Sequence, residues 1–169
     1  VDALVNNAAC QKLEEWLTID SDKWDEMLDV NLKAAQLLMN EVSGHMVSEQ
    51  KKGVIVNISS IEAYQPSANH SHYAISKAGL LMATKAAASE LGQYGIRVNS
   101  VSPGLIDDGN LQDRWPEGVE RWFKSSPLKR LGTPEDVSDA VAFLISEQAK
   151  WITGTDLVVD GGVLTQPSW

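Results

Sequence analysis

Tyr73 and Lys77 stand four residues apart, a spacing that puts a phenol and an ammonium on one face of a helix. Such a pair also occurs by chance on many helices, where it is an ordinary surface pair. Here Ser59 and Ser60 follow a run of β-branched residues, 13 positions before the tyrosine. A free phenol has a pKa of about 10, and a neighbouring ammonium favours the phenolate. We therefore expect Lys77 to lower the pKa of Tyr73, so that Tyr73 can exchange a proton with an oxygen that Ser60 holds.

The elements that must position these groups alternate between short apolar runs and long amphipathic stretches, which is typical of a parallel α/β sheet. Strands are predicted at residues 3–5, 54–58, 96–101 and 156–159. Helices are predicted at residues 21–48, from 71 or 72 to 94, at about 117–124, and from 134 onward. Thr133 suits the N-cap of the last helix, and Gly95 suits the end of the second. Ser60 then follows a central strand, at the sheet edge where α/β proteins bind ligands.

The composition excludes several classes of function. The chain has 169 residues, enough for one domain with a buried core, and no linker or repeat divides it. A formal net charge of −9 argues against nucleic acid or an anionic membrane as a partner, because both require a basic surface. No apolar stretch is long enough to span a membrane and no signal peptide is recognised, so a cytoplasmic protein is expected. Cys10 is the single cysteine, which excludes an internal disulfide.

Further motifs accompany the serine, tyrosine and lysine along the whole sequence. In chain order they are Asn6-Asn7-Ala8, Asn31, Ser60, Tyr73-x-x-x-Lys77, Pro103-Gly104 and Asp160-Gly161-Gly162. In this order and spacing, the chain resembles a classical short-chain dehydrogenase/reductase. The resemblance implies part of a Rossmann-type doubly wound parallel sheet, strands 4-5-6-7 of the family fold, in one incomplete domain covering residues 1–169. It also implies NAD or NADP as cofactor, a small-molecule alcohol or carbonyl compound as substrate, and a homodimer or homotetramer.

The resemblance gives each matching residue a role. Tyr73 would be the general acid/base, Ser60 would bind the substrate oxygen, and Lys77 would hold the ribose hydroxyls of the cofactor. Asn31 would kink the long helix and anchor a water that relays protons. These four residues, Asn31, Ser60, Tyr73 and Lys77, form the implied catalytic set. The implied cofactor contacts are Asn6, Ala8, Tyr73, Lys77, Pro103, Gly104 and Ile106, and no metal is implied. Residues 105–127 correspond to the lid over the substrate.

Three departures from the family pattern bear on cofactor binding. Ala9 stands where the family has glycine, and it adds a methyl group where backbone and cofactor approach closely. The usual threonine after Pro103-Gly104 is replaced within residues 105–108, where Asp108 would repel a pyrophosphate. The glycine-rich turn that lays pyrophosphate on a helix N-terminus does not occur in the 169 residues, nor does the residue that separates NAD from NADP. We therefore expect a fragment that binds dinucleotide weakly unless another chain supplies the missing half.

Two other functions stay open. A non-catalytic, truncated relative could serve as an interaction module; the absent glycine-rich turn favours it and the intact catalytic set argues against it. A dinucleotide-sensing regulator on the same fold would not need Tyr73. His70 and His72 are expected at the rim of a pocket rather than as metal ligands, because no carboxylate or cysteine joins them at suitable spacing. Glu62 could equally line the substrate site or face solvent.

The six tryptophans are many for this length. Trp16 and Trp24 are expected to pack in helices. Trp115 and Trp122 fall in the lid, where they could contact a bulky apolar substrate or pin the lid to the core; we favour the second.

Overall fold

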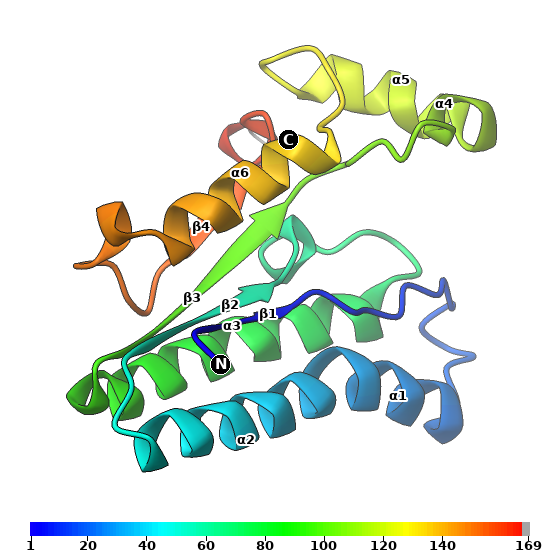
Figure 1. Cartoon of the computed structure of the whole chain (residues 1–169). Coiled ribbons are helices and arrows are strands. Elements are labelled where there is room, and N and C mark those ends of the chain that lie inside the picture. The colour runs from blue at the N-terminus through cyan, green and yellow to red at the C-terminus, as the bar shows by residue number, and fades with distance from the viewer. Residues whose placement is uncertain (167–169) are drawn as a thin grey trace.

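The computed structural model describes residues 1–166, and its centre is a four-stranded parallel sheet (Figure 1). The strands are β1 (Ala3–Asn6), β2 (Gly53–Ile58), β3 (Ile96–Pro103) and β4 (Asp156–Val159). They lie side by side in chain order, so Val5 pairs with Val56, Val56 with Asn99, and Val101 with Leu157. The predicted parallel α/β sheet is confirmed.

Helices cover both faces of this sheet (Figure 1). They are α1 (Ser21–Leu28), α2 (Ala34–Ser48), α3 (Ser71–Leu91), α4 (Leu111–Arg114), α5 (Pro116–Ser125) and α6 (Pro134–Ile145). A π-helical turn, Asp29–Lys33, joins α1 to α2, so the predicted helix over 21–48 is one run with a local irregularity. Short 3₁₀ turns lie at Ile61–Ala63, Gly92–Tyr94, Glu147–Ala149 and Val163–Thr165. No helix among residues 1–166 has the length and apolarity needed to cross a bilayer.

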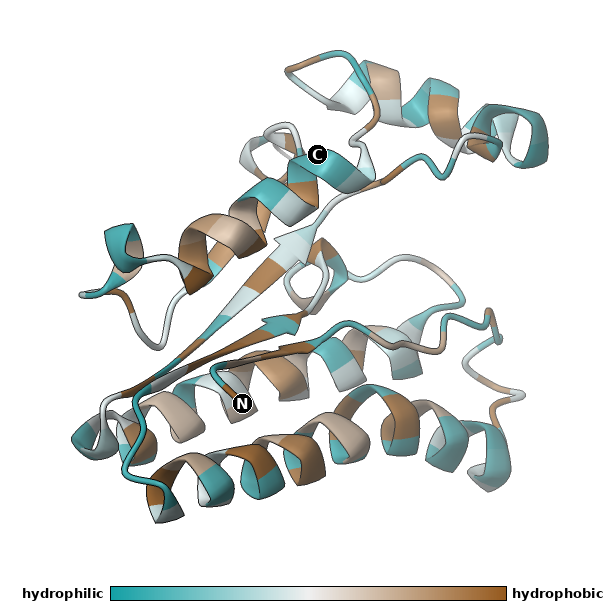
Figure 2. Ribbon diagram, in the orientation of Figure 1, coloured by the Kyte–Doolittle hydropathy of each residue, from teal (hydrophilic) through white to brown (hydrophobic). Residues whose placement is uncertain are grey.

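The core has one layer on each face of the sheet. Successive residues of a strand point to opposite faces, so Ile55 packs on the side of α2 and α3 while Val56 packs on the side of α6. The first layer includes Met39, Met46, Ile55, Ala88, Ile96 and Val98. The second is built on Val56, Val101 and Leu144. Figure 2 shows the corresponding apolar stripes on α2 and α3. This two-sided burial explains why the strand runs are almost continuously apolar.

The helix ends follow the predicted chemistry. The Thr133 hydroxyl accepts from the Asp136 N–H, and the Asp136 carboxylate accepts from the Thr133 N–H, which completes a capping box at the start of α6. After α3, the 3₁₀ turn ends at Gly95, whose φ of 74° is the left-handed conformation expected of a glycine there.

Trp16 contradicts its prediction. It lies in a turn before α1, and its side chain is 69% exposed. The neighbouring Leu13 and Leu17 are also exposed, so this segment has no buried face on which a helix could pack.

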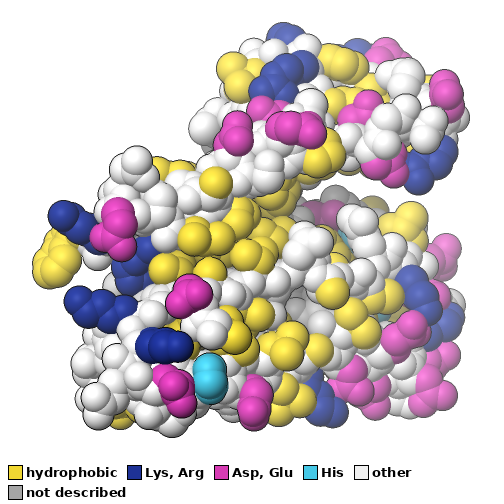
Figure 3. Space-filling model, viewed as in Figure 1, with side chains coloured by type: hydrophobic (Ala, Val, Ile, Leu, Met, Phe, Trp, Pro, Cys, Tyr) yellow, Lys and Arg dark blue, Asp and Glu magenta, His cyan; other side chains and the backbone are white. Residues whose placement is uncertain are grey.

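Strand β1 is an edge of the sheet, since β2 is its only neighbour among the described strands. Val5 on this strand and Val1 just before it are exposed. Figure 3 shows apolar side chains gathered on this side of the molecule, below α6. An exposed apolar edge of this kind favours association.

Candidate active site

Ser60, Tyr73 and Lys77 come together where β2 ends and α3 begins. Tyr73 and Lys77 share one face of α3, with the Lys77 Nζ atom 5.6 Å from the centre of the Tyr73 ring. Ser60 lies two residues after the end of β2, and its hydroxyl lowers the pKa of the Tyr73 phenol. All three residues are buried, with exposed fractions of 8%, 6% and 2%. The arrangement places a hydroxyl, a phenol and an amine at the carboxyl edge of the sheet, where ligands bind in this class of fold.

The Lys77 amine is held inside the protein by a single backbone contact. Its Nζ atom donates to the Ile58 carbonyl oxygen at 2.8 Å. Burial penalises the charged form and lowers the pKa of Lys77 from 10.5 to about 8. The amine can therefore change its charge close to neutral pH.

Burial also governs Tyr73, and in the opposite direction from the one expected. Desolvation raises the pKa of Tyr73 above 10, the hydrogen bond with Ser60 lowers it, and the charge of Glu62 raises it. The expected lowering by Lys77 is wrong for the chain as it stands. The reason is that burial of the phenol is the largest effect on its pKa, while the Lys77 amine donates to the Ile58 carbonyl.

Asn31 sits inside the π-helical turn between α1 and α2 and is 2% exposed. Its Oδ1 atom accepts from the Cys10 N–H at 2.7 Å, and its Nδ2 atom donates to the Cys10 carbonyl at 2.9 Å. Nδ2 also lies 3.1 Å from the Ser76 hydroxyl, which in turn donates to the Tyr73 carbonyl. The implied interruption of the long helix is present at this residue, and it ties the segment after β1 to the start of α3.

The implied cofactor contacts follow the ends of β1 and β3. At the end of β1, Asn6 donates through Nδ2 to Asn57 Oδ1 at 2.8 Å, while its own Oδ1 atom is buried without a partner among residues 1–166. Ala8 is exposed just beyond. Pro103 ends β3, and Gly104 follows it. Because parallel strands end at one edge, these residues flank the catalytic set; Ile106 lies farther out, bridged to Gly132.

One of the two lid tryptophans, Trp122, packs against the core, whereas Trp115 is 40% exposed. The Trp122 Nε1 atom donates to the Arg130 carbonyl at 3.0 Å, and its ring fills the space beside Gly104, where a Cβ atom would meet it at 2.5 Å. Trp122 therefore pins α5 to the core, as predicted. Beside it lies an open cavity of about 410 Å³, whose lining includes Gly104, Ile106, Trp122, Arg130 and Asp160. Asp108, which was expected to face a pyrophosphate, is exposed and paired with Arg114 at 2.7 Å.

His70 and His72 are not at a pocket rim, which corrects the expectation. Both are buried, with 4% and 1% of their surface exposed. The His70 ring stacks on the Tyr73 ring, centres 4.4 Å apart and planes 13° from parallel. Its Nδ1 atom lies 2.9 Å from Glu62 Oε1, so Glu62 turns inward rather than to solvent. The contact between His70 and Tyr73 could have been predicted from their spacing, because a residue three positions before Tyr73 lies on the same helix face.

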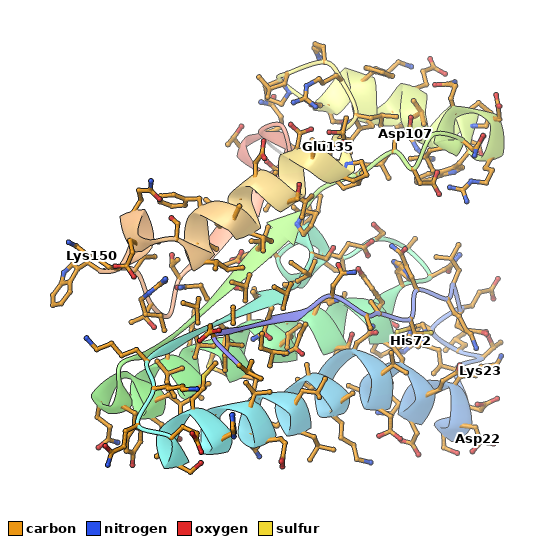
Figure 4. All side chains as sticks on the ribbon, in the orientation of Figure 1. Asp22, Lys23, His72, Asp107, Glu135 and Lys150 are labelled. Atoms are coloured by element: carbon orange, nitrogen blue, oxygen red, sulfur yellow. The ribbon has the colours of Figure 1, made fainter. Side chains whose placement is uncertain are left out.

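His72 belongs to a neighbouring polar cluster. Figure 4 shows it with Lys23 at the end of the molecule where α1 and α3 begin. Lys23 pairs with Glu14 at 2.9 Å, and burial together with the nearby His70 lowers the pKa of His72. Residues 1–166 contain no group of three histidine, cysteine or acidic side chains arranged to hold a metal ion.

Comparison with known proteins finds relatives of the chain in sequence and in structure. The family model described as "Enoyl-(Acyl carrier protein) reductase" matches residues 1–164. Human (3R)-3-hydroxyacyl-CoA dehydrogenase is 41% identical over 160 residues, which cover 95% of this chain and 61% of that protein. The chain thus spans about three fifths of the length of this curated relative.

Solved structures give the same result for the fold. A 4-hydroxyisoleucine dehydrogenase complexed with NADH superposes with a TM-score of 0.91 at 34% identity, covering 98% of this chain and 70% of that one. A structure described as a putative 2-deoxy-D-gluconate 3-dehydrogenase from Agrobacterium tumefaciens, with bound NADP, gives a TM-score of 0.92 at 32% identity, covering 98% and 68%. The partial Rossmann-like sheet implied by the sequence is thereby confirmed.

Proposed function

The chain belongs to the short-chain dehydrogenase/reductase family, and on that premise we propose that it carries the catalytic residues of an NAD(P)-dependent oxidoreductase. The proposed reaction interconverts an alcohol and a ketone or aldehyde in a small molecule. The human relative acts, by its name, on a 3-hydroxyacyl compound, which makes hydroxy and oxo acids and their esters the first substrates to test.

The described residues suit a dinucleotide. Hydroxyl and amine donors from Tyr73 and Lys77 stand at the carboxyl edge of the sheet, and the buried Asn6 Oδ1 atom offers an acceptor that no described residue uses. We propose that Lys77 and Tyr73 hold the ribose next to the nicotinamide, that Asn6 and Ala8 line the adenosine side, and that Pro103, Gly104 and Ile106 receive the carboxamide. When bound, the cofactor supplies or accepts the hydride.

The chain's own residues would manage the oxygen and its proton. Ser60 donates a hydrogen bond to the substrate oxygen and orients it toward the phenol. In the reductive direction Tyr73 gives its proton to the oxygen as an alkoxide develops; in the oxidative direction the phenolate removes that proton. Lys77 stabilises the phenolate once its amine is charged and close, and Asn31, which is held by the backbone of Cys10, would anchor the water that relays protons.

One observation carries the proposal: Ser60, Tyr73 and Lys77 are buried near one another at the carboxyl edge of a parallel sheet. The test is Tyr73→Phe, which removes only the hydroxyl. Turnover of NAD(P)H with a panel of carbonyl compounds should fall by at least about 100-fold, because the acid–base group is gone. Cofactor binding, followed by fluorescence, should stay within about threefold, since Lys77 is retained.

Tyr94→Phe is the matched control, because Tyr94 is 49% exposed and follows α3. The assay should use the 169 residues alone and joined at the amino end to a glycine-rich phosphate-binding segment. We propose that the 169 residues alone bind dinucleotide weakly. Full turnover by Tyr73→Phe would refute the catalytic assignment, and cofactor binding without turnover by the parent protein would favour a regulator.

Self-association is a further part of the proposal. Leu37 and Leu38 on α2 and Met82 on α3 are all about half exposed or more, so the outer side of these helices offers an apolar surface to a second copy. Sedimentation of the parent chain and of Leu38→Glu would test it: a dimer or tetramer should dissociate when the charge is introduced.

A further inference from the structure

Glu62 and His70 form a buried polar pair beside the proposed acid–base group. Both oxygens of the Glu62 carboxylate lie within hydrogen-bonding distance of His70 Nδ1, at 2.9 and 3.0 Å. Because a carboxylate accepts hydrogen bonds, Nδ1 carries the hydrogen in this pair. The His70 and Glu62 side chains are only 5% and 16% exposed, so little water competes for the contact.

The pair is connected to both proposed catalytic hydroxyls. On one side, the His70 ring lies flat against the Tyr73 ring at 4.4 Å. On the other, the Glu62 N–H donates to the Ser60 Oγ atom at 3.1 Å, and this hydroxyl lowers the pKa of the neighbouring phenol. Ser60, Glu62, His70 and Tyr73 thus form a connected series of contacts, in which Glu62 links the Ser60 hydroxyl to the ring that stacks on Tyr73.

Backbone contacts also hold Glu62 and His70 in place. Glu62 lies in the 3₁₀ turn after β2, and its Oε2 atom also accepts the Ser67 N–H at 3.2 Å. His70 is the residue before α3, and its carbonyl accepts the Ala74 N–H at 2.9 Å. The turn and the helix start are therefore clamped to each other across the loop that separates them.

We propose that Glu62 and His70 are positioning residues, which fix the orientation of Tyr73 and Ser60 and set the charge that the phenol experiences. The proposal rests on the function proposed above for Tyr73. It assigns to the pair no contact with substrate, because the Glu62 carboxylate and the His70 Nδ1 atom are turned toward each other.

The charge has a definite sign. The Glu62 carboxylate raises the pKa of Tyr73, so removing that charge should favour the phenolate. The other charged groups around the phenol are Lys77 on α3 and, beyond His72, the ion pair of Glu14 with Lys23. None of these is altered when Glu62 becomes Gln.

Two variants separate the two roles. Glu62→Gln keeps an acceptor for Nδ1–H and removes the charge; His70→Phe keeps a ring against Tyr73 and removes the hydrogen bond. Their matched controls are Glu90→Gln and His45→Phe, both at exposed positions. The first measurement follows the ¹³Cζ resonance of Tyr73 against pH in the 169-residue chain, which has three tyrosines and needs no turnover. The second is the pH profile of kcat and KM in the form that turns over.

Glu62→Gln should lower the pKa of Tyr73 by about half a pH unit and move the phenolate-dependent limb of the oxidative profile down equally. His70→Phe should reduce kcat by about tenfold while KM for substrate changes less than about twofold, because orientation rather than binding is lost. The double variant should have a kcat no lower than that of His70→Phe alone, since the two residues act through one contact.

The inference is overturned if the Tyr73 pKa stays the same in Glu62→Gln and kcat stays the same in His70→Phe. If Tyr73→Phe abolishes turnover in that case, the proposed function survives without it. Conversely, a chain that never turns over but whose Tyr73 resonance shifts in Glu62→Gln would retain the coupling and lose the catalytic role. If His70→Phe does not fold, the pKa of Tyr73 in Glu62→Gln decides by itself whether the inference stands.

Discussion

Replacing Lys77 by Met tests the central electrostatic claim about the site, that a buried amine is kept there at the expense of stability. Methionine has nearly the length of lysine and no charge to desolvate. In the folded chain the pKa of Lys77 is about 8, against 10.5 for the free side chain. Between these two values the unfolded chain binds more protons than the folded chain, so this group makes stability rise with pH.

The magnitude follows from the two pKa values. At about pH 7 the amine disfavours folding by about 3 kcal/mol, and at about pH 9.5 by about 1 kcal/mol. The parent chain should therefore gain about 2 kcal/mol over this interval relative to Lys77→Met, in which the proton linkage is absent. Lys77→Met also lacks the hydrogen bond to the Ile58 carbonyl at every pH. This loss shifts the free energy of unfolding of the variant by a constant amount and does not change how that free energy varies with pH.

The assay is urea unfolding of both proteins across this pH range, with the free energy of unfolding compared pairwise. Pairwise comparison removes the contribution of Tyr64, whose pKa is raised to about 12 by burial and by Asp156 and which lowers stability above about pH 10. Lys85→Met, at an exposed position on the same helix, is the control and should show no such slope. A pH-independent difference between the parent and Lys77→Met would mean that the amine is not desolvated in the folded chain.

Two further substitutions probe the elements that hold the site. Asn31→Ala removes both side-chain hydrogen bonds to the partly buried backbone of Cys10, and it should lower the free energy of unfolding in urea by about 2 to 4 kcal/mol. Asn40→Ala, at an exposed position, should lower it by less than about 0.5 kcal/mol. Equal losses in the two variants would contradict the role of Asn31 in holding this segment. Gly104→Ala puts a methyl group 2.5 Å from the Trp122 ring, so it should lower the free energy of unfolding by about 1 to 3 kcal/mol and change the tryptophan fluorescence. Gly44→Ala is the control, because no atom lies within 4 Å of the added methyl group, and its stability should be unchanged or higher. A silent Gly104→Ala would show that the lid does not pack there.

Most of the fold could be predicted because local and global preferences agree. The composition of the β-branched run at 54–58 predicts a strand, and the structure has a strand there, buried on both faces as this composition favours. Thr133 and Pro134 specify a helix start by hydrogen-bond chemistry alone, and the observed capping box follows it. Spacing likewise predicted that Tyr73 and Lys77 share a helix face.

What could not be predicted depends on which way a side chain turns after packing. The Lys77 amine reaches the Ile58 carbonyl instead of the phenol, and burial of Tyr73 raises its pKa where a lowering was expected. Sequence spacing puts His70 on the helix face of Tyr73, but only the fold brings the Glu62 carboxylate to its ring. A pair separated by eight residues, across a loop, leaves no periodic signal.

Several departures from ordinary folding preferences gather in one place. Elsewhere each face of the sheet carries an apolar layer, and a buried polar side chain such as Asn99 is hydrogen-bonded to neighbouring backbone. Around the end of β2 the chain buries an amine, a phenol, a histidine–carboxylate pair and an asparagine in a π-helical turn. Each of these costs stability that an apolar residue would not, and local exceptions of this kind collect where a protein acts. Since burial sets the pKa of both Tyr73 and Lys77, the same desolvation that weakens the fold at neutral pH also sets the charges on which the proposed proton transfer depends.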